Sequence, residues 1–300
     1  MSQISPKSDW ELYRCFLGVL QHGSLSAAAR ALGITQPTVG RQVAALEREL
    51  GVLLFTRSNG GLRPTDMALS LRGHVEAMGV SVAALKRVAG SAQADGELRG
   101  VVRISCSDVI GVEVLPPVLA GLRRQHPQLK VELVLTDVLQ DLLGREADIA
   151  VRMVRPTQQQ LVARRIGRID VGLHARRDYL ERHGTPRSLS QLAAHALIGY
   201  DQPTPFVRRA AQAFGDLQAD GFSLRTDSNL AQLALIRAGA GIGGCQVPLA
   251  LRDAQLVRVL PKAFVIPLDT WVTMHEDLRR SPPCRVAFDA LAEGLAAYAG

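Results

Sequence analysis

Residues 24–57 constrain the fold of this chain more than any other segment, because they predict two short amphipathic helices joined by a tight turn. Ser24 is a suitable N-cap for the first helix, and apolar residues recur after it at i, i+3, i+4 and i+7. Gly33 supplies the left-handed residue that ends this helix, and Thr35 caps the next one. Pro37 is tolerated in the first turn, since the backbone N–H groups there have no helical partner.

The second predicted helix has one apolar face and one polar face. Apolar side chains recur at spacings of four, three and four: Val39, Val43, Leu46 and Leu50. The opposite face carries side chains suited to a major groove: Gln36, Thr38, Arg41 and Gln42. Gln can bond adenine and Arg can bond guanine through two hydrogen bonds, and the first turns of such a helix meet base edges. Paired helices around a glycine turn also occur in all-α domains of other kinds, so the spacing alone leaves DNA binding open.

A predicted hairpin after the second helix favours DNA binding. Its turn is Ser58-Asn59-Gly60-Gly61, with Arg57 before it and Leu62-Arg63-Pro64 after it. A basic hairpin in this place is a wing that can reach phosphates or the minor groove. The predicted DNA-binding residues are Ser24, Arg30, Thr35, Gln36, Pro37, Thr38, Arg41, Gln42 and Arg57.

A long helix is predicted to follow the wing, opened by Thr65 and Asp66. Apolar residues recur in it at alternating spacings of three and four, the pattern of a coiled-coil seam. Residues 91–96 then read as a flexible link, so we expect the helix to pair with a second subunit. The alternative is a helix that packs on the core of its own domain. The predicted dimerisation residues are Leu71, Val75, Met78, Val82 and Leu85.

From Leu98 onward the pattern changes to alternating strands and helices, which predicts a parallel α/β sheet in two lobes. The first unit has strands at 101–104, 129–135 and 148–151, and helices at 112–125 and 138–145. The second unit has strands at 169–175, 197–200 and 222–225, and a helix at 228–238. A strand at 270–275 and a helix at 283–298 are expected to return to the first lobe.

Polar residues at the predicted strand ends mark a candidate small-molecule site, because ligands of α/β lobes bind there. Ser107 begins a helix whose free N–H groups favour an anion, and Arg152 can hold a carboxylate through two hydrogen bonds. The candidates are Ser105, Ser107, Thr136, Arg152, His174, Thr226, Asn229 and Gln246. Plainer interpretations are an N-cap for Ser107, a turn former for Thr136 and a surface residue for His174. Ser107 and Arg152 therefore predict a small organic anion, such as a carboxylate, as the ligand of this site.

The length of 300 residues and the 47% hydrophobic content are enough for about two domains. The net charge of +7 favours an anionic partner. No secretion signal or membrane-length apolar run is visible, which predicts a cytoplasmic protein without a membrane partner. The four cysteines lack metal-ligand spacing and read as reduced thiols, with a redox pair of Cys106 and Cys245 as the alternative.

The sequence does not suggest an enzyme, a metal site or a cofactor. Gly239 to Gly244 satisfies G-x-G-x-x-G, but it follows a predicted helix rather than a strand, and an acidic residue about 20 positions on is missing. The seven His are dispersed without a ligand pair. A nucleophile elbow or phosphate loop is not recognisable either.

Several motifs together resemble the N-terminal signature of LysR-type transcriptional regulators. They are residues 23–29, 35–42, 46–47, 50–51 and 54–57. Two positions depart from that signature, since Gly40 stands where Ser is common and Ala68 where Gly is usual. Because Gly40 has no hydroxyl, this chain lacks one hydrogen bond that a serine there could make to DNA.

The resemblance implies an N-terminal all-α winged helix-turn-helix with a long linker helix, then an α/β two-lobed periplasmic-binding-protein-like effector domain. The implied domains are 1–65, a linker helix at 66–95 and 96–300, with lobe 1 at about 96–161 and 268–300 and lobe 2 at about 162–267. The implied protein is a homodimeric or tetrameric regulator that binds promoter double-stranded DNA, a small effector and RNA polymerase. The alternative is an α/β enzyme or solute-binding protein with an accessory helical domain.

Overall fold

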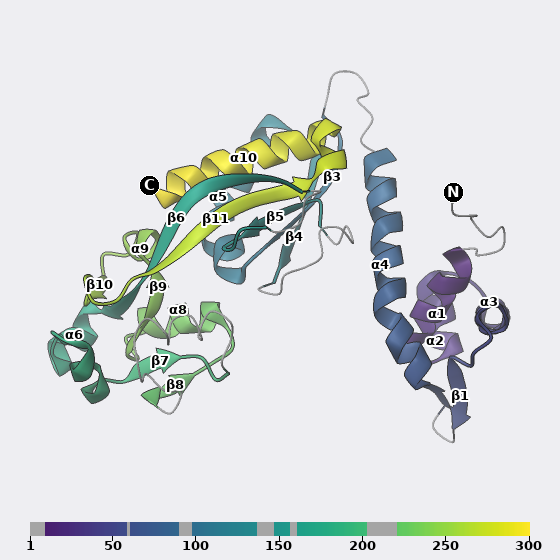
Figure 1. Ribbon diagram of the computed structural model, residues 1–300, viewed down its shortest axis with the longest axis horizontal. Helices are drawn as coiled ribbons and strands as arrows, with labels where there is room; N and C mark the ends of the chain where they lie inside the picture. Colours follow the sequence, from purple (N-terminus) through teal and green to yellow (C-terminus); the bar gives the residue numbers. More distant parts are fainter. Residues whose placement is uncertain (1–9, 59–60, 90–97, 137–146, 157–160, 203–220) are drawn as a thin grey trace. The chain divides into compact units, whose positions relative to one another are not determined.

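The computed structural model describes residues 10–58, 61–89, 98–136, 147–156, 161–202 and 221–300 (Figure 1). They form two compact units that divide between Lys86 and Arg87. In the described residues, no helix is both long enough and apolar enough to cross a membrane.

The N-terminal unit is a winged helix-turn-helix. Its elements are α1 (Trp10–His22), α2 (Leu25–Leu32), α3 (Gln36–Leu50), β1 (Phe55–Ser58), β2 (Gly61–Pro64) and α4 (Asp66–Ala89). The predicted caps are confirmed, because Ser24 accepts from the Ala27 N–H at 3.1 Å and Thr35 from the Thr38 N–H at 3.4 Å. Gly33 has a φ of 69°, the left-handed conformation that its position requires. The helix α1 was not predicted, and it completes the core.

The core of this unit fixes the wing relative to α3. Phe16 of α1 is fully buried, and its ring lies 5.8 Å from that of Phe55 in β1. Glu47 near the end of α3 accepts hydrogen bonds from the backbone N–H groups of Leu54 at 2.7 Å and Phe55 at 3.1 Å. A charged acceptor makes such bonds stronger than neutral ones. The hydrogen bonds of Glu47 therefore fix the start of the wing against the end of α3.

The C-terminal unit is built on one mixed sheet. Its strands are β3 (Gly100–Cys106), β4 (Leu129–Leu135), β5 (Ile149–Arg152), β6 (Leu161–Arg176), β7 (Leu197–Gly199), β8 (Leu224–Arg225), β9 (Ile242–Gln246), β10 (Leu256–Val259) and β11 (Ile266–His275). Its helical elements are η1 (Ile110–Val114), α5 (Leu115–Gln125), α6 (Arg177–His183), η2 (Leu189–Ala194), α8 (Asn229–Arg237), α9 (Val247–Ala250), η4 (Glu276–Arg280) and α10 (Pro282–Ala299). The described strand order is β4-β3-β5-β11-β6-β9-β7-β8, with β10 paired to β6.

The prediction of a wholly parallel sheet is wrong at its centre. Strands β6 and β11 pair with each other in antiparallel fashion, and among the described strands parallel pairing occurs within the β3, β4, β5 group and the β7, β8, β9 group. The sequence predicted only 169–175 and 270–275 of these two strands. Their first halves were missed because exposed arginines in β6 and Pro267 in β11 interrupt the apolar pattern. The helix predicted at 138–145 lies outside the described residues.

The two long strands join two lobes. Lobe 1 surrounds β3, β4 and β5, and lobe 2 surrounds β7, β9 and α6. Ile169 of β6 belongs to the larger apolar core, whereas Val171 and Leu173 belong to the core that includes Tyr179. Strand β6 therefore contributes to both cores, and α10 runs along β6 and β11 (Figure 1).

Candidate functional site

The polar side chains at the start of α3 form one hydrogen-bonded surface. Gln36 is exposed, and its Oε1 accepts from the Ser26 hydroxyl at 2.9 Å. Thr38 shares a hydrogen bond with Thr35 at 2.8 Å, and Arg41 donates to the Thr38 hydroxyl at 3.4 Å. Arg41 is exposed, so its guanidinium remains accessible to a partner. These contacts hold the predicted base-reading side chains in place before any partner arrives.

The other predicted DNA-binding residues surround this surface. Pro37 and Arg30 are exposed, and Gln42 is half-buried. Arg57 lies in β1, and the structure describes its backbone only. Arg63 is exposed on β2, opposite Thr56, and was not among the predicted residues although it lies in the predicted wing. At Gly40 a Cβ would lie 3.7 Å from Leu25, so packing leaves room for the Ser that is common there.

The helix α4 divides into two parts. Leu71 packs against the N-terminal core and Val75 belongs to it, as in the alternative interpretation of this helix. Farther along, Met78 is 40% exposed, Leu85 is 61% exposed and Val82 is half-buried. Dimerisation stays a prediction; among the predicted seam residues Met78 and Leu85 are the exposed ones, and Met67 and Leu69 in the first part of the helix are exposed as well.

Three of the predicted effector-binding residues lie at the carboxyl ends of neighbouring lobe 1 strands, and two of them, Ser105 and Arg152, are in contact. Arg152 at the end of β5 donates to the Ser105 hydroxyl at 2.9 Å, to the Ser105 carbonyl at 3.1 Å and to its neighbour Val151 at 3.0 Å. The Thr136 N–H donates to the carbonyl of Cys106 at 2.8 Å. The three bonds of Arg152 fix its guanidinium at the edge where ligands of α/β lobes bind.

A second group links this edge to α8. Ser107 is half-buried just before the helical turn at Asp108, whose carboxylate accepts from the Asn229 side-chain amide at 3.2 Å. Asn229 in turn accepts from the hydroxyl of Tyr200. Thr226 lies just before α8 and accepts from the Ser228 N–H at 3.2 Å. Sequence reasoning missed Asp108 and Tyr200, although the first follows Ser107 and the second ends a predicted strand.

His174 and Gln246 have other surroundings. His174 is 2% exposed on β6, where its Nδ1 bonds the carbonyl of Gly172 at 2.9 Å, so the interpretation as a surface residue is wrong, while its role in effector binding stays a prediction. Gln246 is buried and accepts from the hydroxyl of Tyr298 in α10 at 2.6 Å. The sequence could not separate these two from the strand-end group, because all of them lie near strands.

Burial of His174 predicts a loss of stability in acid. Desolvation lowers the pKa of His174 from 6.5 to about 4. Between these values the unfolded chain binds a proton that the native chain does not, so the free energy of unfolding falls as pH drops from 6.5 to 4. We expect this one group to contribute about 3 kcal/mol. Urea titrations of wild type and His174→Gln across that range measure it, and equal pH slopes in both proteins would contradict it.

The cysteines are expected to be unreactive in the native protein. All four are buried, and burial raises the pKa of Cys245 to about 12. A thiol reacts through its thiolate, which is scarce at such a pKa. A colorimetric thiol assay at pH 8 should detect reaction only after denaturant is added. Rapid labelling of Cys106 and Cys245 in native protein would instead revive the redox alternative.

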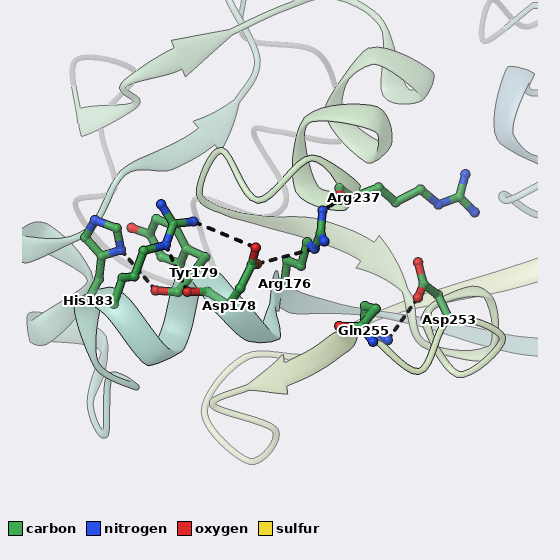
Figure 2. A network of polar contacts seen from close by, with 8 residues as sticks. Arg176, Asp178, Tyr179, His183, Arg237, Asp253 and Gln255 are labelled. Carbon is green, nitrogen blue, oxygen red and sulfur yellow. Dashed lines mark hydrogen bonds and ion pairs between the residues drawn. The ribbon is translucent and has the colours of Figure 1, made fainter.

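A further polar network beside α6 involves residues that were not predicted (Figure 2). Arg176 forms an ion pair with Asp178 at 3.3 Å and donates to the carbonyl of Arg237 at 3.4 Å. His183 bonds the carbonyl of Tyr179 at 2.9 Å. The network therefore ties the end of α8 to the start of α6.

Both units match known family models. Residues 10–69 match the model described as bacterial regulatory helix-turn-helix protein, lysR family, and residues 95–296 match the LysR substrate binding domain. The chain is 28% identical over 299 residues to a probable HTH-type transcriptional regulator, LtrA of Klebsiella pneumoniae, covering 94% of this chain and 93% of LtrA. It is 32% identical over 257 residues to the HTH-type transcriptional regulator PtxR of Pseudomonas aeruginosa, covering 82% and 80%.

Solved structures share the fold. CrgA of Neisseria meningitidis, a LysR-type transcriptional regulator, has a TM-score of 0.57 at 24% identity, covering 96% of this chain and 99% of CrgA. Full-length CbnR in complex with its target DNA has a TM-score of 0.66 at 19% identity, covering 96% and 100%. The chain belongs to the LysR family of DNA-binding transcriptional regulators, with an N-terminal helix-turn-helix domain and a C-terminal effector-binding domain.

Proposed function

We propose that this regulator reads promoter DNA with the start of α3 and responds to a small organic anion bound between its α/β lobes. The observation that carries the DNA-reading role is the exposed, hydrogen-bonded surface of Gln36, Thr38 and Arg41. Its residue types match those that read base edges in a major groove. A regulatory rather than catalytic role agrees with the relatives, which are named as transcriptional regulators.

Two copies of the chain would present two such surfaces. The proposed contact is the second part of α4, where Met78, Val82 and Leu85 offer apolar side chains. Paired recognition helices read two half-sites about one helical turn apart. We propose a homodimer or homotetramer of this kind in the cytoplasm, which also contacts RNA polymerase, with domains at 1–65, 66–95 and 96–300.

The proposed effector site is the lobe 1 edge around Ser107, Thr136 and Arg152, facing Thr226 and Asn229 of lobe 2. An anion there would meet the guanidinium of Arg152 and the polar start of the helix after Ser107. A small carboxylate suits these groups best.

A mobility-shift experiment tests the DNA-binding role. The full chain is titrated onto the DNA just upstream of its own gene, with a coding fragment of the same length as control. We expect preference for the upstream fragment and affinity that falls steeply with salt, because phosphate contacts release counterions. Equal binding to both fragments, or none, would favour the alternative of an α/β enzyme or solute-binding protein.

Arg152→Ala tests the effector site. We expect a thermal-shift screen of small carboxylates to find at least one that stabilises the wild type. Its affinity should fall about 10- to 100-fold in Arg152→Ala, since a charged hydrogen-bond pair contributes about 1.5–3 kcal/mol. Each protein is compared with its own ligand-free melting temperature, and Arg168→Ala, which removes an exposed arginine of β6, is the matched control. Equal stabilisation of wild type and Arg152→Ala would contradict the proposal.

A further inference from the structure

One short segment of lobe 1 holds α8 of lobe 2 at both of its ends. At the start of α8, the Asp108 carboxylate accepts from the side-chain amide of Asn229 at 3.2 Å and from the Leu230 N–H at 3.4 Å. A negative charge is favourable at a helix start, where N–H groups lack helical partners. Asp108 thus caps a helix that lies more than 100 residues away in the chain and packs on β9 and β7.

The other end of α8 is held by an ion pair. Glu113 accepts two hydrogen bonds from the guanidinium of Arg237, at 2.7 Å and 2.9 Å. The pairing lowers the pKa of Glu113 and raises that of Arg237. The backbone carbonyl of Glu113 also accepts from Arg252 at 2.9 Å, which adds a further link between the lobes.

The local fold explains why residues 108–113 can make both contacts. Ile110–Val114 is a turn of π-helix, a wider form that often marks functional sites. A Cβ at Gly111 would lie 2.1 Å from the Leu135 side chain, so the missing side chain lets the segment pack closely on β4. The segment is therefore seated on lobe 1 while its carboxylates reach lobe 2.

The two contacts differ in strength. The Asp108 bonds are 3.2 Å and 3.4 Å long, whereas the Glu113–Arg237 pair is short, charged on both sides and bidentate. The carbonyl of Arg237 is also held by Arg176 (Figure 2). The start of α8 is thus the weaker attachment and its end the stronger.

We infer that Asp108 and Glu113 form a two-point clasp on α8 that fixes the lobes relative to each other, releases at Asp108 first and pivots at Glu113–Arg237. One part of this inference rests on the proposed function, namely that an effector bound beside Ser107 releases Asp108. The clasp itself is a property of the ligand-free chain.

Distances between spin labels test the clasp in the full chain. Labels are placed on cysteines introduced at exposed Arg124 of α5 and Glu181 of α6, one on each lobe, since the native cysteines are buried. Labelled protein is diluted tenfold with unlabelled protein, so that an oligomer rarely carries two labelled copies. The clasp predicts one narrow distance distribution in the otherwise native protein.

The Asp108→Ala/Glu113→Gln double variant should at least double the width of that distribution, and Asp108→Ala alone should broaden it less. Asp269→Asn is the matched control, because it breaks an exposed ion pair with Arg165 of 2.6 Å that does not involve α8. A double variant that melts cooperatively and keeps the narrow native distribution would overturn the clasp. Neither DNA nor effector is present, so this failure would be separate from failure of DNA binding in the mobility-shift experiment.

Discussion

Replacing Arg41 by alanine is expected to weaken binding to the specific DNA site about 10- to 100-fold, since one base-reading arginine contributes about 1–3 kcal/mol. Arg41 is exposed near the start of α3, where it donates to Thr38 within the surface that also includes Gln36. Under the proposed DNA-reading role, removing Arg41 loses both a base contact and part of the side-chain arrangement around it. Fluorescence anisotropy with a labelled operator fragment, at one fixed salt concentration, measures the change.

Arg48→Ala is the matched control for this variant. It removes the same charge from the same helix, but Arg48 lies near the end of α3, where its Nε donates to the carbonyl of Ala44 at 3.2 Å. We expect it to change affinity only a few-fold, and for specific and unrelated DNA alike. If Arg41→Ala and Arg48→Ala reduced specific binding equally, Arg41 would be a phosphate contact and not a base reader.

Replacing Phe16 by alanine is expected to destabilise the N-terminal unit by about 3–5 kcal/mol, the usual cost of removing a fully buried aromatic ring. Phe16 is completely buried and packs against Phe55, so its loss leaves a cavity between α1 and the wing. Because the two units divide at Lys86, the C-terminal unit should keep its own melting transition. Scanning calorimetry of the full chain should show one transition lowered and the other unchanged.

Leu251→Ala provides the comparison, since it shortens an apolar side chain that is 81% exposed. We expect it to change the free energy of unfolding of neither unit by more than about 0.5 kcal/mol. DNA binding should be lost in Phe16→Ala at temperatures where its N-terminal unit is unfolded. A single transition that moves as a whole in Phe16→Ala would show that the units unfold together.

Features set by neighbouring residues were predictable. The caps at Ser24 and Thr35, the left-handed Gly33 and the wing all depend on a few adjacent residues, and the structure has them as expected. The family resemblance also rests on this segment and is confirmed over both units. Arg152 and Ser105 could be placed at one edge because parallel neighbouring strands end on the same side.

Features set by distant residues were not predictable. Asp108 and Asn229 lie 121 positions apart and meet only because the lobes fold against each other. The buried environment of His174 depends on β9 and β10, which flank β6 from later in the chain. Likewise, the heptad pattern of α4 is compatible with packing against a second subunit or against the core of its own domain. Val75 is buried because α1 packs beside it.

The sequence by itself therefore determined the family, the helix-turn-helix and the alternation of strands and helices, because hydrophobic period, caps and turn residues act over short distances. Only the tertiary structure decided that β6 and β11 run antiparallel through both lobes, which residues of the strand-end group meet, and that α8 is held by Asp108 and Glu113. These depend on which surfaces pack together, and a one-dimensional pattern does not specify that choice.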